Sequence, residues 1–192
     1  PLHRCIIDGY SETGVTIMYM APGMDDGDII TQKSIKIEDT DNVGTIHDKL
    51  SILGRDLLLE TLPSIFNGTN ARTHQDESEV TFAYNIKREE EKLDFNKTAR
   101  EVFNHIRGMY PFPVAYTTLN GEIIKVCESK IGTKTNGNIG EIISIYDNGI
   151  GVKCSDNEII ITKLKPSGKK EMMARDFING RGKDKLLGEK LC

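Results

Sequence analysis

The sequence predicts an α/β unit followed by an all-β unit, with a polar linker between them. Three observations support this division. Apolar runs of strand length and a long segment with helical periodicity fill residues 1–68, whereas residues 70–92 are polar and aperiodic. After residue 114, short alternating segments are separated by Asn-Gly and Asp-Asn turns. With 192 residues the chain is long enough for one large domain or two small ones.

The α/β unit is expected to begin with two extended segments. Gly14 to Met20, "GVTIMYM", is apolar apart from Thr16 and Tyr19, which is typical of a strand buried on both faces. A second extended segment is expected over residues 28–37, after an acidic turn.

A long amphipathic helix is expected next, ending near Gly68. Its N-cap is Asp41 or Asn42, since both residue types accept hydrogen bonds from free N–H groups at a helix start. Apolar residues recur at steps of three and four and define the face that packs inward: Val43, Ile46, Leu50, Leu53, Leu57, Leu58, Leu62 and Ile65.

A second helix should follow the linker, capped by Asp94 and ending at Gly108, with Ala99, Val102, Phe103 and Ile106 facing inward. The remaining sequence predicts five short strands, because Asn120-Gly121, Asn148-Gly149 and Asp156-Asn157 are strong hairpin turns. Closely spaced hairpins favour a small β-barrel over a sheet with crossover helices. A short helix is expected over Met172 to Ile178.

Charge is divided unequally along the chain. The net charge of −4 combines −8 in residues 1–92 (9 basic, 17 acidic) with +4 in residues 93–192 (16 basic, 12 acidic). A basic second unit is suited to a polyanionic partner. No run reaches the roughly 18 apolar residues of a membrane span, and four scattered cysteines predict neither a disulfide framework nor a metal site. We therefore expect a soluble, cytoplasmic protein without a membrane partner or a metal.

The acidic turn "APGMDDGDII" leaves three interpretations open. Taken alone it is most simply a solvated turn, because Asp and Gly are the residues that tight turns use. A calcium loop of the EF-hand type needs an acidic twelfth residue, and Lys36 stands there when Asp25 is the first. A catalytic carboxylate is the third interpretation, since open α/β sheets place ligands beyond the carboxyl ends of their strands.

Five ordered motifs resemble the methionyl-tRNA formyltransferase family. "TGVTIMYM" followed by "GMDDGDI" is similar to the family's "TGVTIM" and "GLDTGD". Four later segments are also similar to family motifs: residues 46–59 to "LHDKL", 81–95 to the "TYAPKI" linker, 106–117 to "PWPGAYT" and 164–180 to "LQPAGKKxMxAxDFLNG". These matches run along the whole chain. The resemblance therefore favours the catalytic interpretation of the acidic turn over the solvated one.

The resemblance implies a fold and a domain order. Residues 1–75 correspond to the C-terminal part of a Rossmann-like formyltransferase domain, residues 76–92 to a linker, and residues 93–192 to an OB-like β-barrel that binds tRNA. It also implies a reaction, the transfer of a formyl group from 10-formyltetrahydrofolate to the amino group of methionyl initiator tRNA. If a targeting segment has been lost, an organelle matrix is the alternative location.

The family's catalytic Asp falls on Asp25. The amine must attack as a free base and the formyl oxygen gains negative charge, so a carboxylate that handles protons suits this chemistry. The rest of the loop is implied to line the folate pocket: Ala21, Gly23, Met24, Asp26, Gly27 and Asp28. Arg88 and Lys92 match basic linker positions, with Lys87 beside them, and Lys169 and Lys170 match the family's "GKK".

Each of these basic residues also has a plain structural interpretation. The segment "KREEEK" carries equal numbers of positive and negative charges and suits a solvated helix face, and Lys169 and Lys170 are as well suited to a structural role as to RNA contact. The family's "N-x-H" segment, whose Asn and His hold the formyl oxygen, would lie upstream of Pro1. We therefore expect the chain to be a fragment that is inactive alone. Two further functions stay open: formyl transfer to an amino sugar on a nucleotide carrier, and RNA binding without catalysis.

Overall fold

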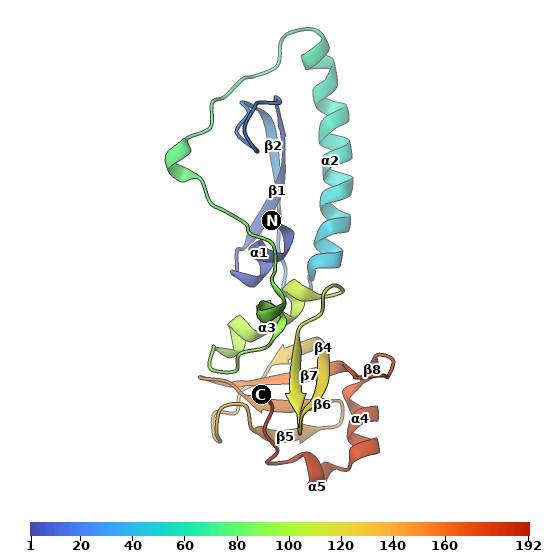
Figure 1. Ribbon diagram of the computed structural model, residues 1–192. Coiled ribbons are helices and arrows are strands. Elements are labelled where there is room, and N and C mark those ends of the chain that lie inside the picture. Colours follow the sequence, from blue (N-terminus) through green and yellow to red (C-terminus); the bar gives the residue numbers. More distant parts are fainter.

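Two antiparallel strands and a long helix form the N-terminal unit of the computed structural model, which describes residues 1–192. The elements of this unit are α1 (Leu2–Ile7), β1 (Glu12–Met18), β2 (Ile29–Lys36) and α2 (Val43–Phe66). Figure 1 shows α2 running the length of the β1–β2 hairpin, with the C-terminal unit below both. Both predicted extended segments are confirmed as strands.

The β1–β2 pair runs in register from Glu12 opposite Lys36 to Ile17 opposite Thr31. The prediction that the first strand is buried on both faces is wrong, because no residue of β1 is fully buried. Helix α2 covers the hairpin closely enough that a Cβ on Gly54 would lie 3.5 Å from Val15. The strand β1 is therefore less buried within residues 1–192 than its apolar sequence predicts.

Helix α2 begins where the sequence predicted. Asn42 is the N-cap, and its side chain accepts a hydrogen bond from the Thr45 N–H while the Thr45 hydroxyl accepts one from the Asn42 N–H. This reciprocal pair satisfies two backbone donors at the helix start. The helix ends at Phe66, just before Gly68. Of the predicted inward face, Val43, Ile46 and Leu57 are buried, whereas Leu58 is 42% exposed.

A long connection of mostly irregular chain joins the two units, with short 3₁₀ turns η1 (Glu77–Glu79) and η2 (Arg88–Glu91). It leaves the far end of α2 and returns past the hairpin to the C-terminal unit (Figure 1). Near its end the Arg4 guanidinium of α1 donates to the Tyr84 carbonyl and pairs with the Glu90 carboxylate at 2.7 Å. The connection is thus attached to the N-terminal unit and to α3.

Helix α3 (Ala99–Met109) starts later than predicted. Its N-cap is Thr98, in a capping box with Glu101, so the prediction of Asp94 as the cap is wrong. The Asp94 carboxylate instead accepts the Asn96 N–H at 3.0 Å and caps a turn before the helix. Thr98 is preferred to Asp94 as the N-cap because Glu101, three residues after Thr98, completes the capping box. Phe103, predicted to face inward, is half-buried.

The C-terminal unit holds one antiparallel sheet and two short helices. Its elements are β3 (Tyr116–Leu119), β4 (Glu122–Ile131), β5 (Ile142–Tyr146), β6 (Gly149–Lys153), β7 (Glu158–Pro166), β8 (Met172–Met173), α4 (Ala174–Arg181) and α5 (Lys183–Leu186). The strand order is β3-β4-β7-β6-β5, with β8 beside β7. The predicted turn at Asn120-Gly121 is confirmed, since Leu119 pairs with Glu122. The second hairpin is also present, but Gly149 pairs with Tyr146, so its turn residues are Asp147 and Asn148, one position earlier than predicted. Asp156-Asn157 lies in a four-residue connection between Lys153 and Glu158.

The predicted closed barrel is not confirmed, because strand pairing leaves β3 and β5 as the two edges of the sheet. The last residues of the chain lie between these edges. Cys192 exchanges two backbone hydrogen bonds with Thr118 on β3, and the Leu191 N–H donates to the Gly140 carbonyl ahead of β5. Irregular chain thus occupies the place where a closing strand pair was expected.

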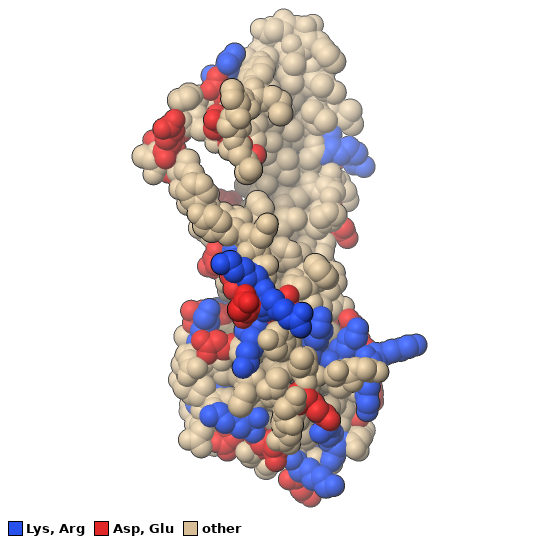
Figure 2. Space-filling view, viewed as in Figure 1, with Lys and Arg blue, Asp and Glu red and all other residues tan.

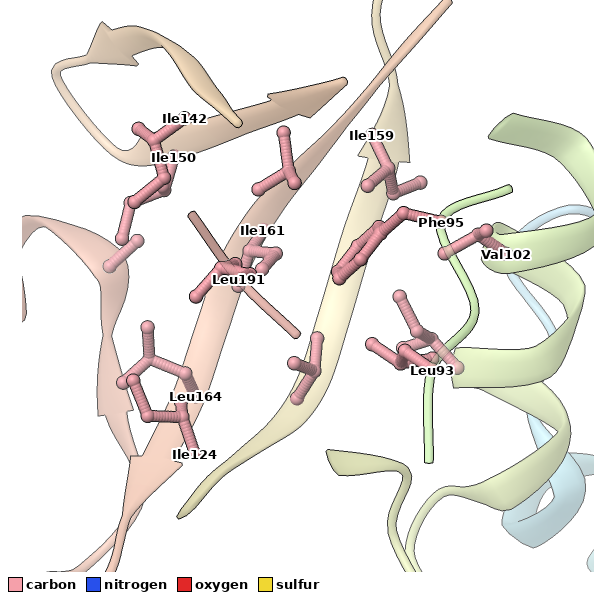
Figure 3. Packing of buried hydrophobic residues seen from close by; sticks show 14 of the residues in the cluster. Leu93, Phe95, Val102, Ile124, Ile142, Ile150, Ile159, Ile161, Leu164 and Leu191 are labelled. Carbon is pink, nitrogen blue, oxygen red and sulfur yellow. The ribbon is translucent and has the colours of Figure 1, made fainter. Parts of the chain in front are cut away.

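One continuous core fills the C-terminal unit. Twenty-two buried residues form the cluster, among them Leu93 and Phe95 from the end of the connection and Val102 from α3. Figure 3 shows Phe95 beside Ile159 of β7, with Leu93 and Val102 on the α3 side of the core and Ile142 and Ile150 on the other side. The second cluster, in the N-terminal unit, has only three buried members, so burial of apolar side chains stabilises the C-terminal unit more than the N-terminal one.

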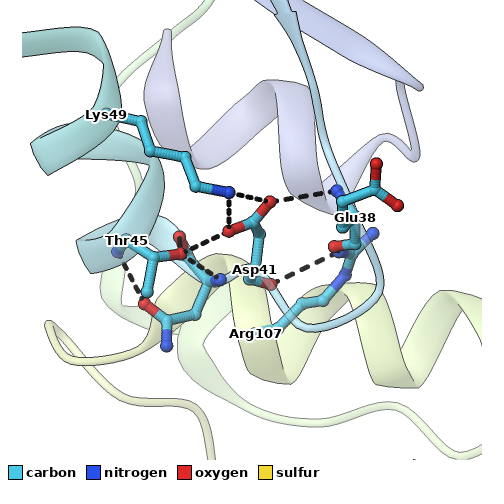
Figure 4. A network of polar contacts seen from close by, with 6 residues as sticks. Glu38, Asp41, Thr45, Lys49 and Arg107 are labelled. Atoms are coloured by element: carbon cyan, nitrogen blue, oxygen red, sulfur yellow. Dashed lines mark hydrogen bonds and ion pairs between the residues drawn. The ribbon is translucent and has the colours of Figure 1, made fainter.

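A buried polar network joins the two units at the start of α2 (Figure 4). The Asp41 carboxylate accepts hydrogen bonds from Lys49 Nζ (2.7 and 2.8 Å), the Thr45 hydroxyl (2.9 Å) and the Glu38 N–H (3.0 Å). Arg107 of α3 donates to the carbonyls of Glu38 (2.7 Å) and Asp41 (3.3 Å). Since α3 belongs to the C-terminal core, Arg107 fixes that core to the β2–α2 turn.

Close helix packing strengthens this junction. A Cβ on Gly108 would lie 2.6 Å from the side chain of Ile7, so α1 and α3 approach at a distance that only glycine allows. His3 Nδ1 lies 2.8 Å from the Gly108 carbonyl oxygen, and Arg100 pairs with Asp39 at 2.7 Å. The relative orientation of the two units is therefore set by several contacts between their helices.

Candidate functional site

The acidic turn forms a compact loop at the end of the β1–β2 hairpin that lies far from the C-terminal unit (Figure 1). The Tyr19 N–H donates to the Asp28 carbonyl at 3.0 Å and closes the base of the loop. Gly27 packs against this base so tightly that a Cβ would lie 1.8 Å from the Tyr19 carbonyl oxygen. The loop can therefore adopt this shape only with glycine at position 27.

Asp25 occupies the tip of the loop in a left-handed backbone conformation, with φ of 57°. Asp and Asn tolerate this region better than most residues, yet it remains uncommon for any residue other than glycine. The Asp25 side chain is exposed. An unusual backbone geometry at an exposed carboxylate is the kind of strain that clusters at active sites.

The Asp28 carboxylate anchors the base of the loop to a distant segment. Arg72 donates to one oxygen, and His74 Nδ1 lies 3.1 Å from the other. The hydrogen bond from Arg72, followed by that from His74, lowers the pKa of Asp28. The Arg72 guanidinium also lies over the Tyr19 ring, 4.8 Å from its centroid. Asp28 is thus a structural anion that joins the loop to the start of the linker.

Backbone pairing extends this anchor. Ile29 and Thr73 exchange two backbone hydrogen bonds of 2.8 and 2.9 Å, and the Gln75 side chain donates to two carbonyls of the loop. Asn70 donates to the Tyr19 hydroxyl at 2.7 Å. Residues 70–75 therefore act as a clamp along one side of the acidic loop.

The structure brings all of the predicted loop residues together. Gly23, Met24, Asp25 and Asp26 are exposed, Ala21 and Asp28 are half-buried, and Gly27 is buried. The side chains of Met20 and Met24 are 97% and 92% exposed. The loop thus presents carboxylates, apolar side chains and free backbone groups on a fixed frame.

Sequence reasoning missed Arg72, His74 and Gln75, which it assigned to an aperiodic polar stretch. Each contacts a loop residue 44 to 50 positions earlier in the chain. No local periodicity reports such a contact. The one usable signal was an Arg, a His and a Gln clustered just after the predicted helix stop at Gly68.

The predicted RNA-contacting residues fall into two exposed groups. The first group is at η2, where Lys87 precedes the turn, Arg88 begins it and Lys92 follows it. The second group is Lys169 and Lys170, on the turn between β7 and β8. Figure 2 shows Lys and Arg side chains gathered where the linker meets the C-terminal unit and around the β8 side of that unit. The loop with Asp25 lies well apart from both groups.

Local contacts distinguish the charges of "KREEEK". Glu90 pairs with Arg4 and accepts the Lys87 N–H, and the hydrogen bond from Arg4 lowers the pKa of Glu90. The negative charge of Glu90 is thereby balanced by Arg4 of α1. It therefore neutralises the positive charges of Lys87, Arg88 and Lys92 less than the sequence alone implies. Lys169 lines a surface groove of about 770 Å³ whose floor includes Phe177.

No group of three or more His, Cys, Asp or Glu side chains is placed to hold a metal ion. No helix combines the length and the apolar character needed to cross a bilayer.

Two protein-family models match the chain. The model described as "Formyl transferase, C-terminal domain" matches residues 85–182, and the one described as "Formyl transferase" matches residues 1–62. The chain belongs to the formyl transferase family. The acidic loop lies in the segment that matches the "Formyl transferase" model, and η2 and the β7–β8 turn lie in the segment that matches the C-terminal-domain model.

Among curated proteins, "Methionyl-tRNA formyltransferase" of Staphylococcus aureus strain MW2 is 49% identical to this chain over 193 residues. The match covers 100% of the chain and 62% of that relative, so the chain spans less than two thirds of the length of the curated relatives it matches.

Solved structures share the fold of this chain. HypX from Aquifex aeolicus, crystallised with tetrahydrofolic acid, superposes with a TM-score of 0.70 at 16% identity, over 92% of this chain and 32% of that chain. An N-formyltransferase from Helicobacter canadensis, in complex with folinic acid and dTDP-3-aminofucose, superposes with a TM-score of 0.61 at 20% identity, over 83% and 59%. At these identities the likeness concerns the fold alone.

Proposed function

We propose that the protein to which this chain belongs transfers a formyl group from 10-formyltetrahydrofolate to the amino group of methionyl initiator tRNA, in translation initiation in the cytoplasm. Family membership and 49% identity to a relative of that name support this proposal. The observation that carries it is the exposed Asp25 carboxylate, held in a left-handed backbone conformation on a loop clamped from one side.

The carboxylate suits the proton transfers of this reaction. The acceptor amine is largely protonated at neutral pH and must lose a proton before its nitrogen can attack the formyl carbon. A new C–N bond then forms as the bond between the formyl carbon and the folate nitrogen breaks, and a proton passes to that nitrogen. Asp25 accepts the proton from the amine side and orients the donors that stabilise the formyl oxygen.

The loop also fits a folate-like co-substrate. Such ligands need apolar contact with a flat ring and a few polar groups at its edge. Met20 and Met24 offer exposed apolar surface on the loop, and the absence of a side chain at Gly23 leaves room for the Asp26 carboxylate against the backbone. We therefore assign Ala21, Gly23, Met24, Asp26, Gly27 and Asp28 to the folate side of the pocket, Gly27 and Asp28 through the loop shape that they hold.

For the acceptor, we propose that the C-terminal unit is an OB-like module whose basic residues contact the tRNA backbone. Support comes from the C-terminal tail, which hydrogen-bonds toward both open edges of the sheet. The exposed positions of Lys87, Arg88, Lys92, Lys169 and Lys170 also favour it, since lysine and arginine dominate affinity for phosphates.

The test is a formyl-transfer assay on the complete polypeptide that contains this chain. We expect methionyl initiator tRNA to be formylated, and Asp25→Asn to lower kcat by about 100-fold or more while Asn still tolerates the backbone conformation. Transfer to a nucleotide-linked amino sugar in place of tRNA would favour the sugar alternative. Binding of tRNA without transfer to either acceptor would favour RNA binding alone.

A further inference from the structure

The Gln75 side chain makes the hydrogen bonds that tie the tip of the acidic loop to the rest of the molecule. Its Nε2 lies 2.8 Å from the Asp25 carbonyl oxygen and 2.7 Å from the Gly27 carbonyl oxygen. Within the loop, residues 20–27 make no other hydrogen bond to the surrounding structure. The conformation of the tip thus depends on one amide group that comes from outside the loop.

The chemistry of this contact is specific to a primary amide. The NH₂ group carries two hydrogens and no acceptor, so it can donate to both carbonyls at once. A glutamate of the same shape offers only oxygens, which would face two carbonyl oxygens without a proton between them. The two accepting carbonyls belong to the residues on either side of Asp26, so the bonds fix the turn in which Asp25 holds its φ of 57°.

Arg72 and His74 have a different role from Gln75. They hold the Asp28 carboxylate at the base of the loop, where β2 begins, and neither contacts the tip. Gln75 lies in the same segment, one residue beyond His74, and reaches the tip itself. The clamp is therefore divided between an ionic contact at the base and an amide contact at the tip.

We propose that Gln75 is a positioning residue that sets the backbone of Asp25 for proton transfer. The inference rests on the function proposed above, in which the Asp25 carboxylate handles protons. Without the two hydrogen bonds, the tip relaxes toward commoner backbone conformations and the carboxylate moves away from the acceptor amine. Misplacement of a catalytic group by about 1 Å can reduce rate by about 100-fold.

The first test compares Gln75→Glu with Gln32→Glu in the complete polypeptide. Gln32 donates from β2 to the Thr16 hydroxyl on an exposed face, so the same chemical change there serves as the matched control. We expect Gln75→Glu to lower kcat by about 100-fold, with the KM for methionyl initiator tRNA and the melting temperature close to those of the control. Gln75→Asn keeps both donors on a shorter side chain and should recover part of the rate.

A second measurement needs no turnover. Backbone chemical shifts and 15N relaxation at residues 20–27, recorded by NMR without folate or RNA, should show a more mobile loop in Gln75→Glu than in Gln32→Glu. The same quantities in α3 and β7, which belong to the C-terminal core, should be equal in the two variants. Equal shifts and relaxation of the loop in the two variants would overturn the inference even if Gln75→Glu were slow.

A double substitution separates positioning from a general effect. On the Asp25→Asn background, Gln75→Glu should cause little further loss of kcat, because a residue that acts through Asp25 has nothing left to position. If the loss of kcat in the double variant equals the product of the losses in the two single variants, the inference is overturned while the proposed formyl-transfer function stands. A wild-type polypeptide that formylates no acceptor would overturn both the proposed function and this inference.

Discussion

At the scale of single residues, the acidic loop is determined by steric space and by backbone conformation at two different positions. Gly27 is required for space, since a side chain there would collide with the Tyr19 carbonyl, although its φ is not in the left-handed region. Asp25 carries the carboxylate to which we assign proton transfer, and an Asp tolerates a left-handed φ. The two requirements act together, because the base must close for the tip to be held.

Gly27→Ala should destabilise the protein through the base of the loop. A methyl group 1.8 Å from the Tyr19 carbonyl oxygen forces Tyr19 or Gly27 to move and breaks the hydrogen bond between Tyr19 and Asp28. We expect the free energy of unfolding to fall by about 1–3 kcal/mol, measured by urea denaturation.

Gly180→Ala is the matched control for that substitution. A Cβ at this position in α4 meets nothing within 4 Å. Alanine favours a helix over glycine by about 0.5–1 kcal/mol, so this variant should be as stable as the wild type or slightly more stable. Equal urea midpoints for the two variants would contradict the steric argument at Gly27.

The sequence could predict the loop residues but not the residues that clamp them. Asp25, Asp28 and Gly27 lie together in one short motif, which resembles a family motif and follows a strand. Arg72 and Gln75 reach them across 44 and 50 positions, through a fold that no local pattern describes. The same distinction explains why Asp25 was identified as a candidate and Gln75 was not.

At the scale of elements, turns and caps were predictable where the signal was local and complete. The Asn120-Gly121 turn joins β3 and β4 as expected, and Asn42 caps α2. Asp94 failed as a cap because a Thr98–Glu101 capping box lies four residues further on and satisfies two donors at once. Burial of β1 failed for another reason, since it depends on which elements cover the hairpin and not on the strand's own sequence.

The Asp41 network at the start of α2 should make stability depend on acid pH. Burial alone would raise the pKa of Asp41, but the hydrogen bonds from Lys49, Glu38 and Thr45 outweigh it and lower the pKa below its ordinary value of 3.8. A carboxyl with a lowered folded pKa binds fewer protons when folded. Its contribution is therefore fully present above pH 3.8 and is lost as pH falls through the folded pKa.

Asp41→Asn tests this dependence. At pH 7 the variant should be less stable than the wild type by about 1–3 kcal/mol, because the charge-assisted hydrogen bonds weaken. The difference should begin to shrink below about pH 3.8, where Asp41 of the unfolded chain takes up a proton, and should be smallest once pH lies below the lowered folded pKa. Asp147→Asn, at an exposed turn residue, removes the same charge without a network and serves as the control. A difference that persists unchanged into strong acid would contradict the assignment.

At the scale of the whole molecule, the two units are joined by a fixed junction while their proposed tasks are far apart. The Arg107 network and the close α1–α3 contact hold the C-terminal core against the β2–α2 turn. The Asp25 loop lies at the opposite end of the hairpin (Figure 1), and the linker spans the distance between them. An acceptor that reaches both the loop and the basic residues must therefore be large, as a tRNA is.

The salt dependence of RNA binding tests whether the linker lysines and arginine contact phosphates. Each phosphate contact that a protein loses lowers the slope of log K against log salt by about 0.9 for a duplex. Replacing Lys87, Arg88 and Lys92 together by Gln should reduce that slope by about 2 to 3 for methionyl initiator tRNA, with weaker binding at low salt. Titration by fluorescence anisotropy at several salt concentrations measures both quantities.

The control removes three exposed positive charges from the N-terminal unit: Lys33→Gln, Lys36→Gln and Arg55→Gln. This variant has the same net charge as the linker variant, so a purely long-range field would affect both alike. We expect the slope of log K against log salt for this variant to stay near that of the wild type. Its three substituted residues lie on β2 and α2, outside both η2 and the C-terminal unit. Equal reductions in the two variants would assign RNA binding to overall charge and would remove η2 from the proposed interface.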